Sequence, residues 1–148
     1  MYFVNINSLK EQHTSGQYQE KDSLVYAIAS VVLTYLGVLL VTYPESIWLN
    51  VQMAVEAALF LVMFVTAYRS NGGNEGSRFL DKFLSIGWVV GIRLIPLAII
   101  LGVVSLYGDA TYYGKETDHV GPYSLVTMLI FYLFFIWRLS KHIRDIRN

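Results

Sequence analysis

The chain has 148 residues, enough for one domain, and its formal net charge is zero. Its mean hydropathy of +0.46 and its 55% of hydrophobic residues, which form long runs, exclude an ordinary soluble protein and predict that lipid surrounds most of the chain. The zero net charge argues against a nucleic-acid-binding protein that attracts phosphates with its overall charge, and the absence of cysteine excludes disulfides and thiolate metal sites.

Residues 1–23 are mostly polar and predict a cytoplasmic N-terminal segment, in which the apolar residues near the start suggest a short interfacial helix. The apolar run that follows is too long for the hydrophobic region of a signal peptide and has no small-x-small cleavage site at its end. We therefore expect it to remain as a first membrane span over about 24–43. The proline in residues 44–46 then predicts a tight turn.

Three further apolar runs predict membrane spans over about 47–68, 84–107 and 123–138. A link rich in glycine and asparagine, residues 69–82, joins the first two of these runs, and a link rich in tyrosine and acids, residues 108–122, joins the last two. The last run is short for a hydrocarbon core of about 30 Å, so we expect its helix to continue toward the headgroups.

These spans predict an all-α fold, an integral membrane bundle of four transmembrane helices with short connecting loops and a transmembrane domain over residues 24–138. Residues 139–148 place apolar residues on one helical face and cations on the others, which predicts a basic amphipathic tail at an anionic lipid surface. We interpret the tail as a topology anchor, and the alternative is a binding site for a particular lipid or partner. The membrane-surface cations are Arg138, Lys141, Arg144 and Arg147.

The distribution of lysine and arginine predicts the orientation of the chain in the membrane. Nine of these residues flank the spans on the side of both termini, and only Lys115 flanks them on the opposite side. Cytoplasmic segments carry such an excess of positive charge. We therefore expect a multi-pass membrane protein with both termini in the cytoplasm, in the inner or plasma membrane if the source is bacterial.

Two ionisable residues lie inside the predicted spans, Glu56 in the second and Arg93 in the third. Each is about 13 Å from the start of its span, on opposite sides of the membrane, so their depths differ by only about 4 Å. We therefore expect a buried ion pair that Gln52, one turn from Glu56, can share. Pro96 frees a backbone carbonyl beside Arg93. The pair either holds two helices in register or contacts a proton, an ion or a substrate.

Small residues four positions apart predict close approach between helices. Gly87 and Gly91 form one such face on the third span, and Ala54 and Ala58 form another on the second. Either face can pack within the chain or between subunits, and internal packing is the simpler use of each.

Catalytic and metal-binding patterns are missing from the sequence. His119 is accompanied only by acids of the link over residues 108–122, which is a poor set of ligands for a transition metal. The glycine-rich residues 72–77 have no P-loop lysine, and no nucleophile elbow or paired carboxylates occur. We therefore expect no enzyme activity, no cofactor and no metal.

The sequence thus predicts a small non-enzymatic polytopic membrane protein that assembles with itself or with a larger membrane partner, in which a Glu–Arg pair organises the bundle. Its partners are the lipid bilayer and other membrane chains, and not nucleic acid. The alternative is a small homo-oligomeric ion or proton channel, or a transporter, that uses the same polar residues.

Overall fold

The computed structural model describes residues 2–40, 47–113 and 120–147. These residues contain no strand, so the predicted all-α class is confirmed. Predictions that concern the turn at 44–46 and the His119 cluster lie outside the described residues. The elements are α1 (Ile6–Thr14), α2 (Glu20–Leu40), α3 (Ile47–Ser70), the 3₁₀ turn η1 (Gly73–Glu75), α4 (Phe79–Tyr112) and α5 (Pro122–Arg144).

Three of the described helices, α3, α4 and α5, are long and apolar enough to cross a membrane. Their 24, 34 and 23 residues correspond to about 36, 51 and 34 Å of helix, compared with a hydrocarbon core of about 30 Å. The chain is therefore consistent with a multi-pass membrane protein. The first predicted span extends past Leu40, beyond the described part of α2, so the count of four spans stays a prediction.

Helix α1 gives the N-terminal segment a packed structure. The Asn5 side chain caps the helix by accepting hydrogen bonds from the backbone N–H groups of Asn7 and Ser8, at 3.1 and 3.2 Å. Ile6 and Leu9 are buried on one face and pack on the first half of α4. The polar segment predicted over residues 1–23 is thus part of the bundle, and α2 begins at Glu20 instead of Leu24.

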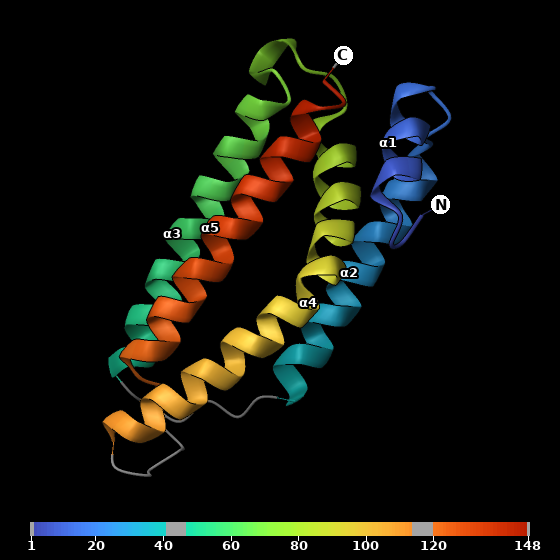
Figure 1. The fold of residues 1–148 in the computed structure, drawn as a ribbon. Coiled ribbons are helices and arrows are strands. Elements are labelled where there is room, and N and C mark those ends of the chain that lie inside the picture. Colours follow the sequence, from blue (N-terminus) through green and yellow to red (C-terminus); the bar gives the residue numbers. More distant parts are fainter. Residues whose placement is uncertain (1, 41–46, 114–119, 148) are drawn as a thin grey trace.

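The packing order of the helices differs from their order in the sequence. Figure 1 shows α5 between α3 and α4, with α2 on the far side of α4. Helix α3 contacts α4 near their linked ends, where the Phe64 ring lies 5.1 Å from Phe79 and 5.3 Å from Phe83. Helices α3 and α4 are consecutive and antiparallel, yet α5 is the main neighbour of both.

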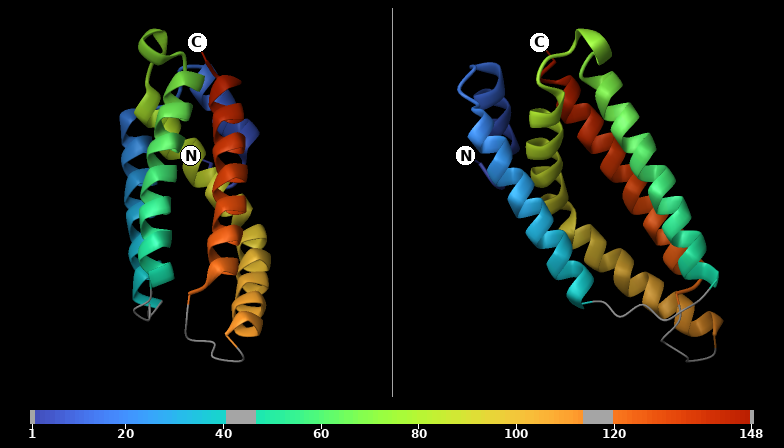
Figure 2. Two further views of the ribbon diagram at one scale, coloured as in Figure 1. Left: turned by 90° about the vertical axis from the view of Figure 1, so that its left-hand side faces the viewer. Right: turned by 180° about the vertical axis from the view of Figure 1, so that it is seen from behind.

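The long helix α4 bends near its middle, in the region of Pro96 (Figure 2). Proline removes a backbone donor and its ring displaces the preceding turn, so a bend at this position has a local cause. The first half of α4 lies beside α2, and the second half turns toward the start of α5 (Figure 1).

The hydrophobic core lies where α1, the first half of α4 and the last half of α5 meet. We call this the inner end of the bundle; it also contains the link 71–78 and the C-terminal end of α5. We call the opposite end, with Asp109 and the start of α5, the outer end. An ion pair between Lys10 and Asp145 joins α1 to the C-terminal end of the described chain, so both belong to the inner end. The fully buried aliphatic residues of this core are Leu9, Ile86, Val89, Leu139, Ile143 and Ile146.

Candidate functional site in the membrane-spanning helices

Glu56 lies on the exposed surface of α3. Its Oε1 atom accepts a hydrogen bond of 2.5 Å from the Tyr132 hydroxyl of α5, because α3 packs along α5. Around this contact is an open hollow of about 520 Å³ that Met53, Ala57, Phe60 and Leu61 also line. The carboxylate is therefore accessible from the side of the bundle.

Arg93 is also exposed, on a different helix. Its Nε atom donates a hydrogen bond of 2.9 Å to the backbone carbonyl of Val4. The Tyr26 hydroxyl accepts a hydrogen bond from the Tyr2 backbone N–H and donates one to the Tyr2 carbonyl, both at 3.0 Å. These two bonds hold the N-terminal segment against α2. The N-terminal segment thus supplies the acceptor for Arg93.

The predicted Glu56–Arg93 ion pair does not form among the described residues. Glu56 has Tyr132 as its partner and Arg93 has Val4. The prediction assumed that helices consecutive in sequence are neighbours along their whole length, whereas α5 lies between α3 and α4 through most of the bundle. Both charged side chains are consequently exposed on the surface of the chain.

Gln52 also departs from its predicted role. It lines a cavity of about 300 Å³ between α3, α4 and α5, together with the hydroxyls of Ser105, Ser124 and Thr127. Its Oε1 atom is buried and has no hydrogen-bond partner among the described residues. Gln52 also borders a second hollow with Glu56, so the two side chains share one wall of α3.

The two predicted small-residue faces have different environments. A Cβ atom added at Gly87 would lie 4.0 Å from Leu139, and one at Gly91 would lie 3.7 Å from Phe135, so both glycines pack toward α5. They also line an apolar groove of about 470 Å³ between α2 and α3. Ala54 and Ala58, in contrast, are exposed on α3.

Asp109 is a structural residue that the sequence did not single out. Its buried carboxylate accepts hydrogen bonds from the backbone N–H groups of Gly121, Tyr123 and Ser124, at 3.1, 2.9 and 3.1 Å, and from the Ser124 hydroxyl. It therefore caps α5 from another helix. A Cβ atom at Gly121 would lie 2.4 Å from Asp109, so this approach requires glycine. In the sequence, the Gly-Pro pair at the start of α5 was the available indication that a helix begins here and that its first N–H groups need an acceptor.

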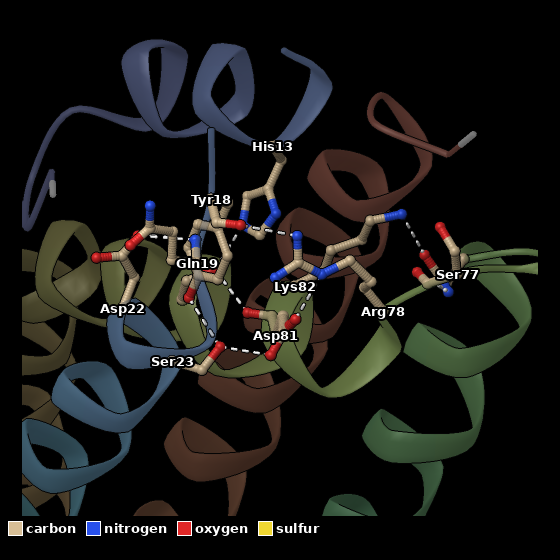
Figure 3. A network of polar contacts seen from close by, with 11 residues as sticks. His13, Tyr18, Gln19, Asp22, Ser23, Ser77, Arg78, Asp81 and Lys82 are labelled. Carbon is tan, nitrogen blue, oxygen red and sulfur yellow. Dashed lines mark hydrogen bonds and ion pairs between the residues drawn. The ribbon is translucent and has the colours of Figure 1, made fainter. Parts of the chain in front are cut away.

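A polar network closes the inner end (Figure 3). The Asp81 carboxylate accepts hydrogen bonds from Arg78 Nε, at 2.8 Å, and from the Ser23 hydroxyl, at 2.5 Å. Arg78 also donates to the backbone carbonyl of Tyr18, at 2.8 Å. Arg78 adopts a left-handed backbone conformation with φ of 51°, which is uncommon for a non-glycine residue, and these contacts hold it there.

His13 is the titratable centre of this network. Its ring stacks on Tyr18 with centroids 3.9 Å apart, and its Nε2 atom lies 2.9 Å from the Ser85 hydroxyl. The Ser85 hydroxyl donates its only hydrogen to the Asp81 carbonyl, so His13 Nε2 donates to Ser85. Burial lowers the pKa of His13 to about 4, and the charges of Lys82 and Arg78 act in the same direction.

Lys82 links the network to the end of α3. The side chain is 3% exposed and donates a hydrogen bond of 3.0 Å to Asn71 Oδ1, while Asn71 Nδ2 donates to the Ser77 carbonyl. No carboxylate of the described residues forms an ion pair with Lys82. This contact fixes the inner ends of α3 and α4 at the same level.

The predicted basic tail is largely a continuation of α5. Its apolar face, which includes Ile143 and Ile146, is buried in the core. Asp145 pairs with Lys10, and this hydrogen bond lowers the pKa of Asp145. Lys141, Arg144 and Arg147 remain exposed, and the cations of Arg138 and Lys141 lie 5.7 and 5.8 Å from the Trp137 ring.

No group of three or more His, Asp or Glu side chains suited to a metal ion occurs in the described part of the chain. Comparison of the chain with protein-family models, with curated proteins and with solved structures gives no match. The described residues bring Gln52 and Glu56 of α3 together with Tyr132 of α5, and they place Arg93 of α4 apart from these three, against the N-terminal segment.

Proposed function

We propose that this chain is a non-enzymatic subunit of a membrane assembly, with four spans and both termini in the cytoplasm. The observation that carries the proposal is the exposure of Glu56 and Arg93 on helices that are long and apolar enough to cross a membrane. Each has one neutral hydrogen-bond partner among the described residues. Lipid offers neither a counter-charge nor further hydrogen bonds, whereas a neighbouring helix offers both.

The energetic argument concerns the cost of charge in the bilayer. An uncompensated Arg or Asp at the centre of a membrane helix costs about 2.5–3.5 kcal/mol on insertion scales. One neutral hydrogen bond recovers only part of this cost, about 0.5–1.5 kcal/mol. Two such side chains on one small protein therefore favour an arrangement in which other helices cover them.

The surfaces around these charges support the same function. In the apolar windows of α3, α4 and α5, 11%, 17% and 22% of residues are buried within the chain, so most of each helix is available to lipid or to another chain. The small residues Ala54 and Ala58 are exposed on another face of α3 from Glu56, and they allow another helix to approach closely there.

The second candidate function is a small homo-oligomeric channel or transporter. The specific observation in its favour is the open pocket of about 300 Å³ whose largely apolar lining includes Gln52, Ser105 and Ser124. The Gln52 carbonyl oxygen there has no partner among the described residues, so a water molecule or a permeant cation would have an acceptor.

Native mass measurement in lipid nanodiscs tests the assembly. Wild type is compared with Ala58→Leu, which places a large side chain on the exposed face of α3, and with Ala98→Leu as a matched control on an exposed position of α4. We expect a discrete assembly for wild type and the control, and a smaller mass for Ala58→Leu. A wild type that is monomeric and captures no membrane partner would contradict the proposal, and flux into liposomes would identify the channel.

A further inference from the structure

We propose that the partner is a second copy of this chain and that Glu56 of one copy forms an ion pair with Arg93 of the next. This inference rests on the proposed function, and it goes further because it names the partner and the contact. Three properties of the described residues carry it: the depth of the two charges, their separation within one chain, and their remaining hydrogen-bonding capacity.

The two charges lie at similar depth. The Phe64–Phe83 ring contact gives α3 and α4 a common level near their linked ends. Glu56 is eight residues from Phe64 along α3, and Arg93 is ten residues from Phe83 along α4 in the same direction. These separations correspond to about 12 and 15 Å of helix, so the two depths differ by only about 3 Å.

The two charges are held apart within one chain. Glu56 points to α5, where Tyr132 binds it, and Arg93 contacts the N-terminal segment at Val4. Helix α5 lies between α3 and α4 over most of their length, so the pair has no path to form inside one copy without repacking of the bundle.

Each group keeps capacity for a second partner. A guanidinium has five N–H donors, and Val4 takes one; a carboxylate accepts several hydrogen bonds, and Tyr132 supplies one. Both side chains are exposed in the single chain. An intermolecular pair therefore adds charge-assisted hydrogen bonds to the existing contacts.

A second copy of this chain is the partner whose charges match these two side chains. Copies inserted in the same orientation carry both charges at similar depth, so rotation about the membrane normal brings Glu56 of one copy to Arg93 of its neighbour with an offset of only about 3 Å, which the arginine side chain can cover. Each chain supplies one carboxylate and one guanidinium, so a closed cyclic assembly leaves none unpaired. A different protein would have to supply both signs at the same depth.

The decisive experiment mixes two charge-altered chains with different affinity tags. The Glu56→Arg chain carries two cations at this depth, and the Arg93→Glu chain carries two carboxylates. Each alone places like charges at every contact, whereas a mixed assembly in which the two chains alternate restores opposite charges at every contact. We expect at least a tenfold loss of assembled mass for each variant alone in nanodiscs, and recovery of a complex containing both tags when they are reconstituted together.

Disulfide formation tests the same contact with both native charges present. The chain has no cysteine, so single substitutions give an unambiguous signal. Met53→Cys in one tagged copy and Leu97→Cys in the other place thiols about one turn from Glu56 and Arg93, and we expect a crosslinked dimer on oxidation. Met53→Cys with Ile99→Cys, an exposed position on another face of α4, is the matched control.

The outcomes separate this inference from the proposed function. An assembled wild type whose charge variants keep their mass, or which gives no Met53–Leu97 crosslink, overturns the Glu56–Arg93 contact and leaves the assembly intact. Stoichiometric capture of a different membrane protein by a monomeric chain does the same. A wild type that neither assembles nor captures a partner overturns both. If a charge variant fails to fold, the crosslinking result decides.

Discussion

The inner end of the bundle and its middle differ in how far side chains are buried and in how many partners their charged groups have. At the inner end, α1, α4 and α5 bury aliphatic side chains, and Asp81 accepts hydrogen bonds from Ser23 of α2 and from Arg78, three residues before it. In the middle, most apolar side chains are exposed, and Glu56 and Arg93 each have one neutral partner. The comparison indicates that contacts within the chain define the fold at the inner end, whereas the middle leaves most of its apolar surface uncovered by the chain itself.

The largest difference in stability between the two regions is expected when a leucine is replaced by alanine. Leu139 is fully buried in the core, whereas Leu133, less than two turns earlier on α5, is 61% exposed. Leu139→Ala should lower the free energy of unfolding by about 2–5 kcal/mol, as expected for a core cavity. Leu133→Ala should change it far less. Denaturant unfolding in mixed micelles measures both, and equal losses would contradict the comparison.

Removal of the Asp109 cap should have the next largest effect. Asp109→Ala leaves three backbone N–H groups at the start of α5 without their acceptor, and helix-cap substitutions cost about 0.5–2 kcal/mol. Faster amide hydrogen exchange at residues 121–124 should accompany the loss. Glu75→Ala, at an exposed inner-end carboxylate, is the control and should leave that exchange unchanged.

His13 should make the inner end sensitive to acid. Because its pKa is about 4 in the folded state and about 6.5 when unfolded, the unfolded state binds more protons between these values. Stability should therefore be complete above about pH 6.5 and decrease as the pH falls toward about 4. His13→Gln should show a weaker pH dependence over this range. The charges that act on the pKa of His13 are those of Lys82, Arg78, Asp81 and Asp22.

The smallest effect is expected at Gly91. A Cβ atom there would be 3.7 Å from Phe135, an ordinary contact, so Gly91→Ala should be tolerated within the chain. Reduced freedom of the unfolded backbone should then raise the stability by about 0.4–1 kcal/mol, measured as the thermal midpoint. A lower assembled mass for this variant would instead show that Gly91 faces another subunit.

The polar sites were harder to predict than the helices, and Asp109 and Arg93 illustrate why. Helical lengths and apolar runs are local properties, so α3 and α5 begin within one residue of their predicted starts. The acceptor of Arg93 is a backbone carbonyl 89 residues away, and Asp109 binds groups 12 to 15 residues later, across a link. No periodicity in the sequence encodes such partners.

By itself the sequence determined the helical class, the apolar runs and the presence of one ionisable residue, Glu56 or Arg93, inside each of two such runs, because hydropathy and residue spacing along a helix are local quantities. Tertiary structure decided that α5 separates α3 from α4, that the N-terminal segment packs as α1, and that Glu56 and Arg93 do not meet within one chain. The physical reason is that lipid solvates every apolar helix face almost equally, so hydropathy does not specify which helices become neighbours; side-chain packing and a few polar contacts at the helix ends do.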